Sequence, residues 1–126
     1  MLRRRASIGS LVFVLAVSVS PALGEAHAVL VRSMPASRAT LSHPPDRVDL
    51  WFSESLEPAF STVSVWSAAG AQVDRRDGGV GPADPKRLSV RLDALGPGAY
   101  TIRYRVLSVD GHVVEASFQF SVKTTP

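Results

Sequence analysis

The chain has 126 residues, no cysteine and a formal net charge of +3, and its length suits a single domain. The lack of cysteine excludes disulfides, thiolate metal sites and cysteine-based redox centres. The basic residues are scattered, without a stripe of Lys or Arg interleaved with aromatic side chains, so nucleic acid is not expected as a partner.

The first 26 residues have the order of a secretory signal peptide. Three arginines at positions 3–5 precede an apolar run over residues 8–19, and small residues follow the proline at position 21. This order is typical of an export signal, and the apolar run is shorter than the roughly 20 residues of a membrane-spanning helix, which is the alternative interpretation. We therefore expect residues 1–26 to be removed and the mature domain, residues 27–126, to act outside the cytoplasm with no membrane span.

Two cleavage sites fit the small residues, and they leave different N-termini. Gly24 and Ala26 occupy the two small positions if the cut precedes His27, whereas Ala22 and Gly24 occupy them if it precedes Glu25. We prefer the first cut, which makes His27 the N-terminal residue of the mature chain.

Beyond the signal, apolar and polar residues alternate with the period of a β-strand. The strongest strand pattern covers residues 98–106, where the apolar side chains share one face. Strands are expected at residues 28–32, 47–53, 61–67, 71–73, 87–92, 98–106 and 118–122, with a break at 33–37 and a polar surface loop at 74–85. About seven short strands indicate an all-β domain, and we expect an immunoglobulin-like Greek-key β-sandwich, with a small barrel as the alternative.

The chain has three histidines, and two of them stand in a context that suits a metal ion. As N-terminal residue, His27 would offer its α-amine and its imidazole Nδ1 to one ion, and the amine releases its proton readily near neutral pH. Asp110 and His112 flank Gly111 directly after the strongest strand, and the glycine permits a tight turn that directs both side chains to one side. His43 lies in a proline-rich loop and is interpreted as solvent-exposed.

Together these residues supply an amine nitrogen, two imidazole nitrogens and a carboxylate oxygen. Such donors suit Cu(II) in a tetragonal plane, and they also suit tetrahedral zinc. Glu54, just after a predicted strand, is a candidate for hydrogen bonding to a ligand imidazole, with a solvated loop acid as the alternative. Because Asp-Gly is a common turn pair, the alternative interpretation of residues 110–112 is a plain exposed turn.

Several segments of the expected mature chain match a known family. They include His27-Ala28-Val29-Leu30 at its start and Val48-Asp49-Leu50-Trp51-Phe52-Ser53-Glu54 in its first half. The most specific is Asp110-Gly111-His112 after an aromatic-rich strand. In these segments the chain resembles the CopC family of copper-resistance proteins.

The resemblance implies a periplasmic β-sandwich that binds one Cu(II) ion and is not an enzyme. Carried over to this sequence, the ligands are His27, Asp110 and His112, and Glu54 matches an acidic position near the site. Some relatives also bind Cu(I) through a methionine-rich segment, which this sequence lacks. Relatives often act beside a membrane copper transporter of the CopD type, which we expect here to be a separate chain.

Two functions of other classes are kept as alternatives to copper capture for homeostasis, resistance or transfer. An N-terminal histidine with a second histidine on a β-sandwich also describes the copper site of lytic polysaccharide monooxygenases, although Asp110 would occupy a position that oxygen chemistry prefers open. A metal-free immunoglobulin-like interaction module is favoured if cleavage precedes Glu25, because the new amine then lies two residues away from His27.

Overall fold

The computed structural model describes residues 9, 12 and 27–124, and this part of the chain is built from strands. The elements are β1 Leu30–Met34, β2 Thr40–Leu41, β3 Arg47–Phe52, the 3-10 helix η1 Pro58–Phe60, β4 Thr62–Ser67, β5 Gly79–Gly81, β6 Asp84–Arg91, β7 Gly98–Leu107 and β8 Val113–Val122. None of the described residues forms a helix long and apolar enough to cross a membrane. The signal-peptide prediction falls almost wholly outside the described residues.

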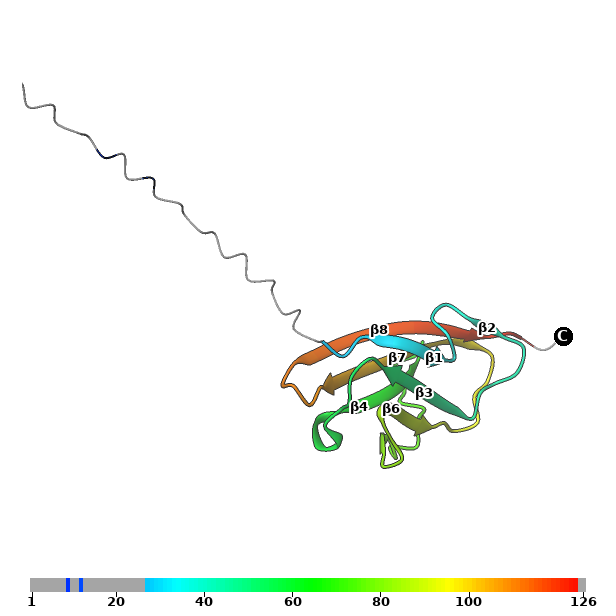
Figure 1. Cartoon of the computed structure of the whole chain (residues 1–126). Coiled ribbons are helices and arrows are strands. Elements are labelled where there is room, and N and C mark those ends of the chain that lie inside the picture. The colour runs from blue at the N-terminus through cyan, green and yellow to red at the C-terminus, as the bar shows by residue number, and fades with distance from the viewer. Residues whose placement is uncertain (1–8, 10–11, 13–26, 125–126) are drawn as a thin grey trace, which may run out of the picture.

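The strands form two four-stranded sheets with the orders β1-β3-β6-β5 and β2-β8-β7-β4. Neighbouring strands are antiparallel except for β2, which runs parallel to β8. The chain passes repeatedly from one sheet to the other, and the sheets pack as two layers (Figure 1). The predicted all-β, immunoglobulin-like Greek-key sandwich is confirmed.

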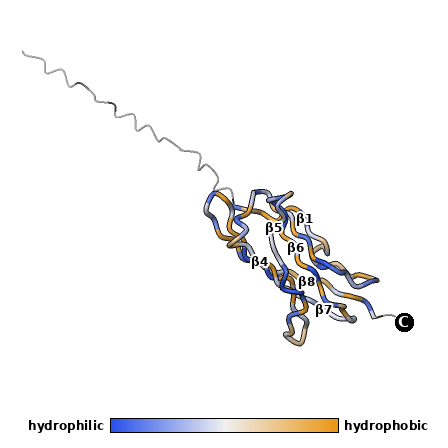
Figure 2. Tube along the Cα trace, turned by 90° about the horizontal axis from the view of Figure 1, so that it is seen from below, coloured by the Kyte–Doolittle hydropathy of each residue, from blue (hydrophilic) through white to orange (hydrophobic). Residues whose placement is uncertain are grey.

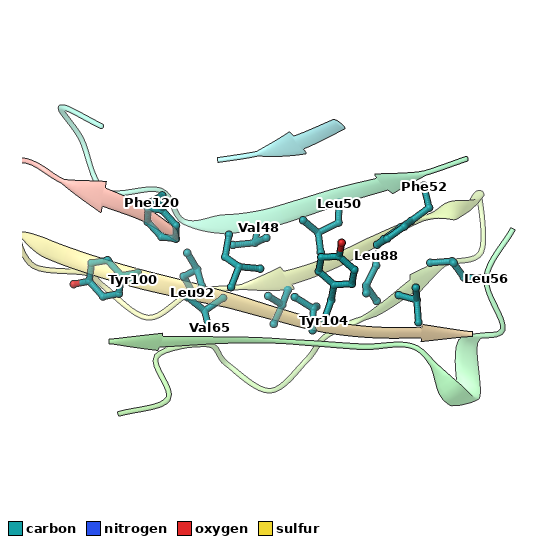
Figure 3. Packing of buried hydrophobic residues seen from close by; sticks show 14 of the residues in the cluster. Val48, Leu50, Phe52, Leu56, Val65, Leu88, Leu92, Tyr100, Tyr104 and Phe120 are labelled. Carbon is teal, nitrogen blue, oxygen red and sulfur yellow. The ribbon is translucent and has the colours of Figure 1, made fainter. Parts of the chain in front are cut away.

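The core lies between the two sheets and follows from the alternation in the sequence. Val48, Leu50 and Phe52 of β3 point inward toward Tyr104 and its neighbours on β7, and all are buried (Figure 3). The rings of Phe52 and Tyr104 meet edge to face with centroids 5.3 Å apart, a favourable aromatic geometry. Hydrophilic and hydrophobic residues accordingly alternate along the strands (Figure 2), as a sandwich with one buried face per sheet requires.

Three local expectations are wrong, and in each the backbone pairing differs from what the pattern of side chains predicts. Residues 71–73 form no strand, and only isolated bridges occur there, between Trp66 and Gln72 and between Asp74 and Leu92. The predicted loop at 74–85 contains β5, whose glycines pair with β6 through main-chain hydrogen bonds, and such bonds require no apolar side chain. The first strand continues through the expected break to Met34, in register with β3.

Asp74 is a buried carboxylate that ties the end of β4 to the segment following it. Its Oδ2 accepts the backbone N–H of Val65 at 2.8 Å, and its Oδ1 accepts the backbone N–H of Arg76 at 2.9 Å. The Nε2 amide of Gln72 donates to both oxygens at 3.0 and 3.2 Å. Since buried donors need partners, this carboxylate is a structural anchor.

Replacing Asp74 with alanine should lower the free energy of unfolding by about 3 kcal/mol, because the buried amide of Val65 loses a charged acceptor. Urea unfolding followed by tryptophan fluorescence measures the change. Asp93→Ala is the control, since Asp93 is exposed and lies 3.9 Å from its nearest cation, Arg75. A loss for Asp74→Ala no larger than the roughly 0.5 kcal/mol typical of surface substitutions would contradict the anchoring role.

Candidate metal centre

The turn between β7 and β8 forms one half of the candidate site. Ser108 donates its backbone N–H to the carbonyl of His112 at 3.0 Å, and Gly111 donates to the carbonyl of Ser108 at 2.9 Å. Gly111 has a φ of +96°, in the left-handed region that glycine adopts without steric cost. The glycine therefore closes the turn as expected and leaves Asp110 and His112 on the same short loop.

Within this turn, Asp110 and His112 are neighbours. Oδ1 of Asp110 lies 3.3 Å from Nδ1 of His112, and it accepts a hydrogen bond from the hydroxyl of Ser108. The Ser108 hydroxyl, followed by the His112 imidazole, holds the pKa of the Asp110 carboxyl below its ordinary value, although partial burial opposes the shift. Asp110 is therefore ionised at neutral pH, as a carboxylate must be to bind a cation.

The other half of the candidate site is the segment that leads into β1. Val29 donates its N–H to Oγ of Ser53 at 2.9 Å, and Ser53 donates its own N–H to the carbonyl of Val29 at 2.8 Å. The Ser53 hydroxyl also contacts the carbonyl of His27 at 3.4 Å. These bonds hold the start of the segment against the end of β3.

The two halves meet through their histidines. The ring centroids of His27 and His112 lie 4.8 Å apart with the rings at 72°, and Figure 1 shows the start of β1 and the β7–β8 turn at the same end of the sandwich. Among residues 27–124 no three His, Asp or Glu side chains are grouped in an arrangement that could hold a metal ion. In the full chain the nitrogen of His27 belongs to the peptide bond with Ala26, so the predicted amine donor exists only after cleavage.

Glu54 and His43 occupy different surroundings. Glu54 is half-buried just after β3, and its segment borders the turn because Val109 donates to the carbonyl of Ser55 at 3.0 Å. In the described part of the chain its carboxylate makes no hydrogen bond or ion pair, so its role as a partner of a ligand imidazole stays a prediction. His43 is exposed in the loop after β2, and β2 pairs with the far end of β8.

Two residues that organise the site were missed from the sequence. The hydroxyl of Ser53 bonds to the backbone of the segment that leads into β1, and the hydroxyl of Ser108 bonds to Asp110 and to the backbone of His112 within the turn. The only signal in the sequence was the position of Ser108 two residues before an Asp-Gly pair, where serine hydroxyls often bond to nearby backbone. Serine is too common in turns for that signal to have singled it out.

Comparison with known proteins identifies relatives over most of the described chain. A family model described as the CopC domain matches residues 30–123. Protein YobA of Escherichia coli is 36% identical over 99 residues, covering 78% of this chain and 80% of its own. Copper resistance protein C of Xanthomonas campestris pv. juglandis is 35% identical over 123 residues, covering 93% of this chain and 96% of its own.

The fold has a solved counterpart as well. The crystal structure of CopC from Methylosinus trichosporium superposes with a TM-score of 0.68 at 31% identity, covering 77% of this chain and 94% of that one. The similarity in sequence and the similarity in structure therefore extend over the same β-sandwich that carries the candidate site.

Proposed function

This chain belongs to the CopC family, and on that premise we propose that its mature form, residues 27–126, captures one Cu(II) ion in the periplasm for copper homeostasis, resistance or transfer. Similar proteins support the assignment to copper, since one relative is named copper resistance protein C and another copper transport protein CutJ. The single observation that carries the proposal is the approach of the His27 and His112 rings to 4.8 Å.

The proposed ligands are the α-amine and imidazole of His27, the imidazole of His112 and the carboxylate of Asp110. Two donors bound side by side on one metal ion, each roughly 2 Å from it, lie about 3 Å apart. The 3.3 Å between Oδ1 of Asp110 and Nδ1 of His112 agrees with that spacing. The amine and imidazole of His27 close a chelate ring within one residue, so binding them requires no further ordering of the chain.

The donor set favours capture and release over catalysis. His27, His112 and Asp110 would hold the ion through four donors, and Asp110 would occupy a position that oxygen chemistry prefers open. About a third of the side chains of Asp110 and His112 is exposed, so a partner can approach the ion directly. We propose that this partner is a separate membrane copper transporter of the CopD type, and that the chain is not an enzyme.

Copper should be selected over zinc, since nitrogen and oxygen sites bind Cu(II) more tightly than Zn(II). Titration of the mature protein with Cu(II), against a competing chelator, should give one ion per chain. An equal concentration of Zn(II) should not displace that ion.

A protein that ignores added Cu(II) would contradict the proposal and favour the metal-free interaction module. Oxidative cleavage of a polysaccharide by the copper-loaded protein with a reductant would also contradict it, and would favour a copper-dependent oxidative enzyme.

A further inference from the structure

We propose that Ser108 is a positioning residue, whose buried hydroxyl fixes the Asp110 carboxylate and the His112 backbone in the arrangement that receives Cu(II). The inference rests on the proposed copper-binding function, because Asp110 and His112 are ligands only under that proposal. Ser108 itself would not contact the ion.

The burial of Ser108 is the first observation. Its side chain is 0% exposed, although it lies in the turn that carries two partly exposed side chains. An isolated bridge to Leu56 holds its backbone against the segment after β3. A hydroxyl buried in such a position must find its hydrogen-bond partners inside the protein, which limits the directions in which it can point.

The partners of this hydroxyl all belong to the ligand loop. Oγ of Ser108 lies closest to Oδ1 of Asp110, and it lies 3.3 Å from both the backbone nitrogen and the carbonyl of His112. A hydroxyl has one proton to donate, and the closest contact assigns that proton to the carboxylate. The oxygen then accepts the N–H of His112, so one buried atom ties both ligand residues together.

This arrangement prepares the loop before the ion arrives. Asp110 is partly exposed, and without a fixed partner its carboxylate would sample several rotamers, each of which must be given up on binding. The bond from Ser108 to Oδ1 leaves a second lone pair on that oxygen and fixes the orientation of the whole carboxylate. Side chains that orient metal ligands in this way typically change metal affinity by about 10–100-fold when they are removed.

Ser61 provides a matched control for the loss of a buried hydroxyl. It is also buried at 3% exposure, and its Oγ accepts the N–H of Leu107 at 3.2 Å, one residue before Ser108. This hydrogen bond of the Ser61 side chain involves no proposed ligand. Replacing Ser61 or Ser108 with alanine therefore removes the same group at the same end of the sandwich.

The experiment compares Ser108→Ala and Ser61→Ala in the mature protein by competition titration with Cu(II) and by Cu(II) EPR. Ser108→Ala should weaken Cu(II) binding by about 10–100-fold and give a mixture of copper spectra. Ser61→Ala should keep the affinity and the single spectrum of the unaltered protein. Equal affinity and an unchanged spectrum in Ser108→Ala would overturn the proposal.

Amide hydrogen exchange of the copper-free, unaltered protein gives a readout independent of the metal and of any variant. The His112 amide, which donates to the Ser108 hydroxyl, should exchange more slowly than the amide of the neighbouring Asp110. Equal exchange rates would overturn the proposal. Failure of the unaltered protein to bind Cu(II) would instead overturn the function on which the proposal rests, and titrating that protein first separates the two outcomes.

Discussion

Replacing His112 with alanine should weaken Cu(II) binding by more than about 100-fold. Loss of a ligand should cost more than loss of a residue that only hydrogen-bonds to a ligand, for which about 100-fold is the upper end. His112 is the residue at which both halves of the site meet, since its ring lies 4.8 Å from the His27 ring and 3.3 Å from the Asp110 carboxylate. Without it, the ion loses one imidazole ligand and keeps only the donors of His27 and Asp110. Competition titration against a chelator of known Cu(II) affinity measures the loss.

His43→Ala is the matched control for this substitution. His43 is exposed and follows β2, which pairs with β8 at the end remote from the turn. It should therefore bind Cu(II) as the unaltered protein does. If His112→Ala kept its affinity within a few-fold, or if His43→Ala lost as much, the assignment of His112 as a ligand would be wrong.

Retaining one residue before His27 should also weaken Cu(II) binding. A protein that begins at Ala26 carries a peptide bond at the nitrogen of His27, and a peptide nitrogen gives up its proton far less readily than an amine does. The chelate ring of amine and imidazole is then lost. Affinity for Cu(II) should fall by more than roughly 10-fold, which is the lower end of the loss expected when a residue that only hydrogen-bonds to a ligand is removed.

The control for this change is a protein that begins at His27 and carries an additional alanine after Pro126. It has the same composition as the protein that begins at Ala26, but it leaves the amine of His27 in place. This control should bind Cu(II) unchanged. Equal affinities for the two extended proteins would show that the amine is not a ligand, and would leave only the imidazole of His27 in the proposed donor set.

The strands that could be predicted from the sequence are those with one buried face. In β7, alternate residues from Tyr100 to Val106 enter the core, and burial imposes the apolar alternation that the sequence displays. β5 and β2 escaped prediction for different reasons. β5 is a glycine-rich edge strand held by backbone bonds, and β2 has only two residues, too few for any period.

The candidate site was predictable in its chemistry and not in its geometry. The spacing of Asp110, Gly111 and His112 indicated a shared turn because a glycine there has a local effect on the backbone. The approach of His27 to His112 depends on the packing of the sheet that contains β1 and β3 against the sheet that contains β7 and β8, and these two residues are remote in sequence. The role of Ser108 depends on burial, which its local sequence does not reveal.

The central claim is that the N-terminal amine of His27 and the turn at residues 110–112 bind one Cu(II) ion together. Cu(II) EPR on the exported protein, with the intact mass determined from the same sample, tests it most directly. We expect a mass that begins at His27 and a tetragonal spectrum with nitrogen and oxygen donors. A mass that begins at His27 together with the spectrum of loosely bound copper would contradict the claim, as would a mass that begins at Glu25 with the same tetragonal spectrum.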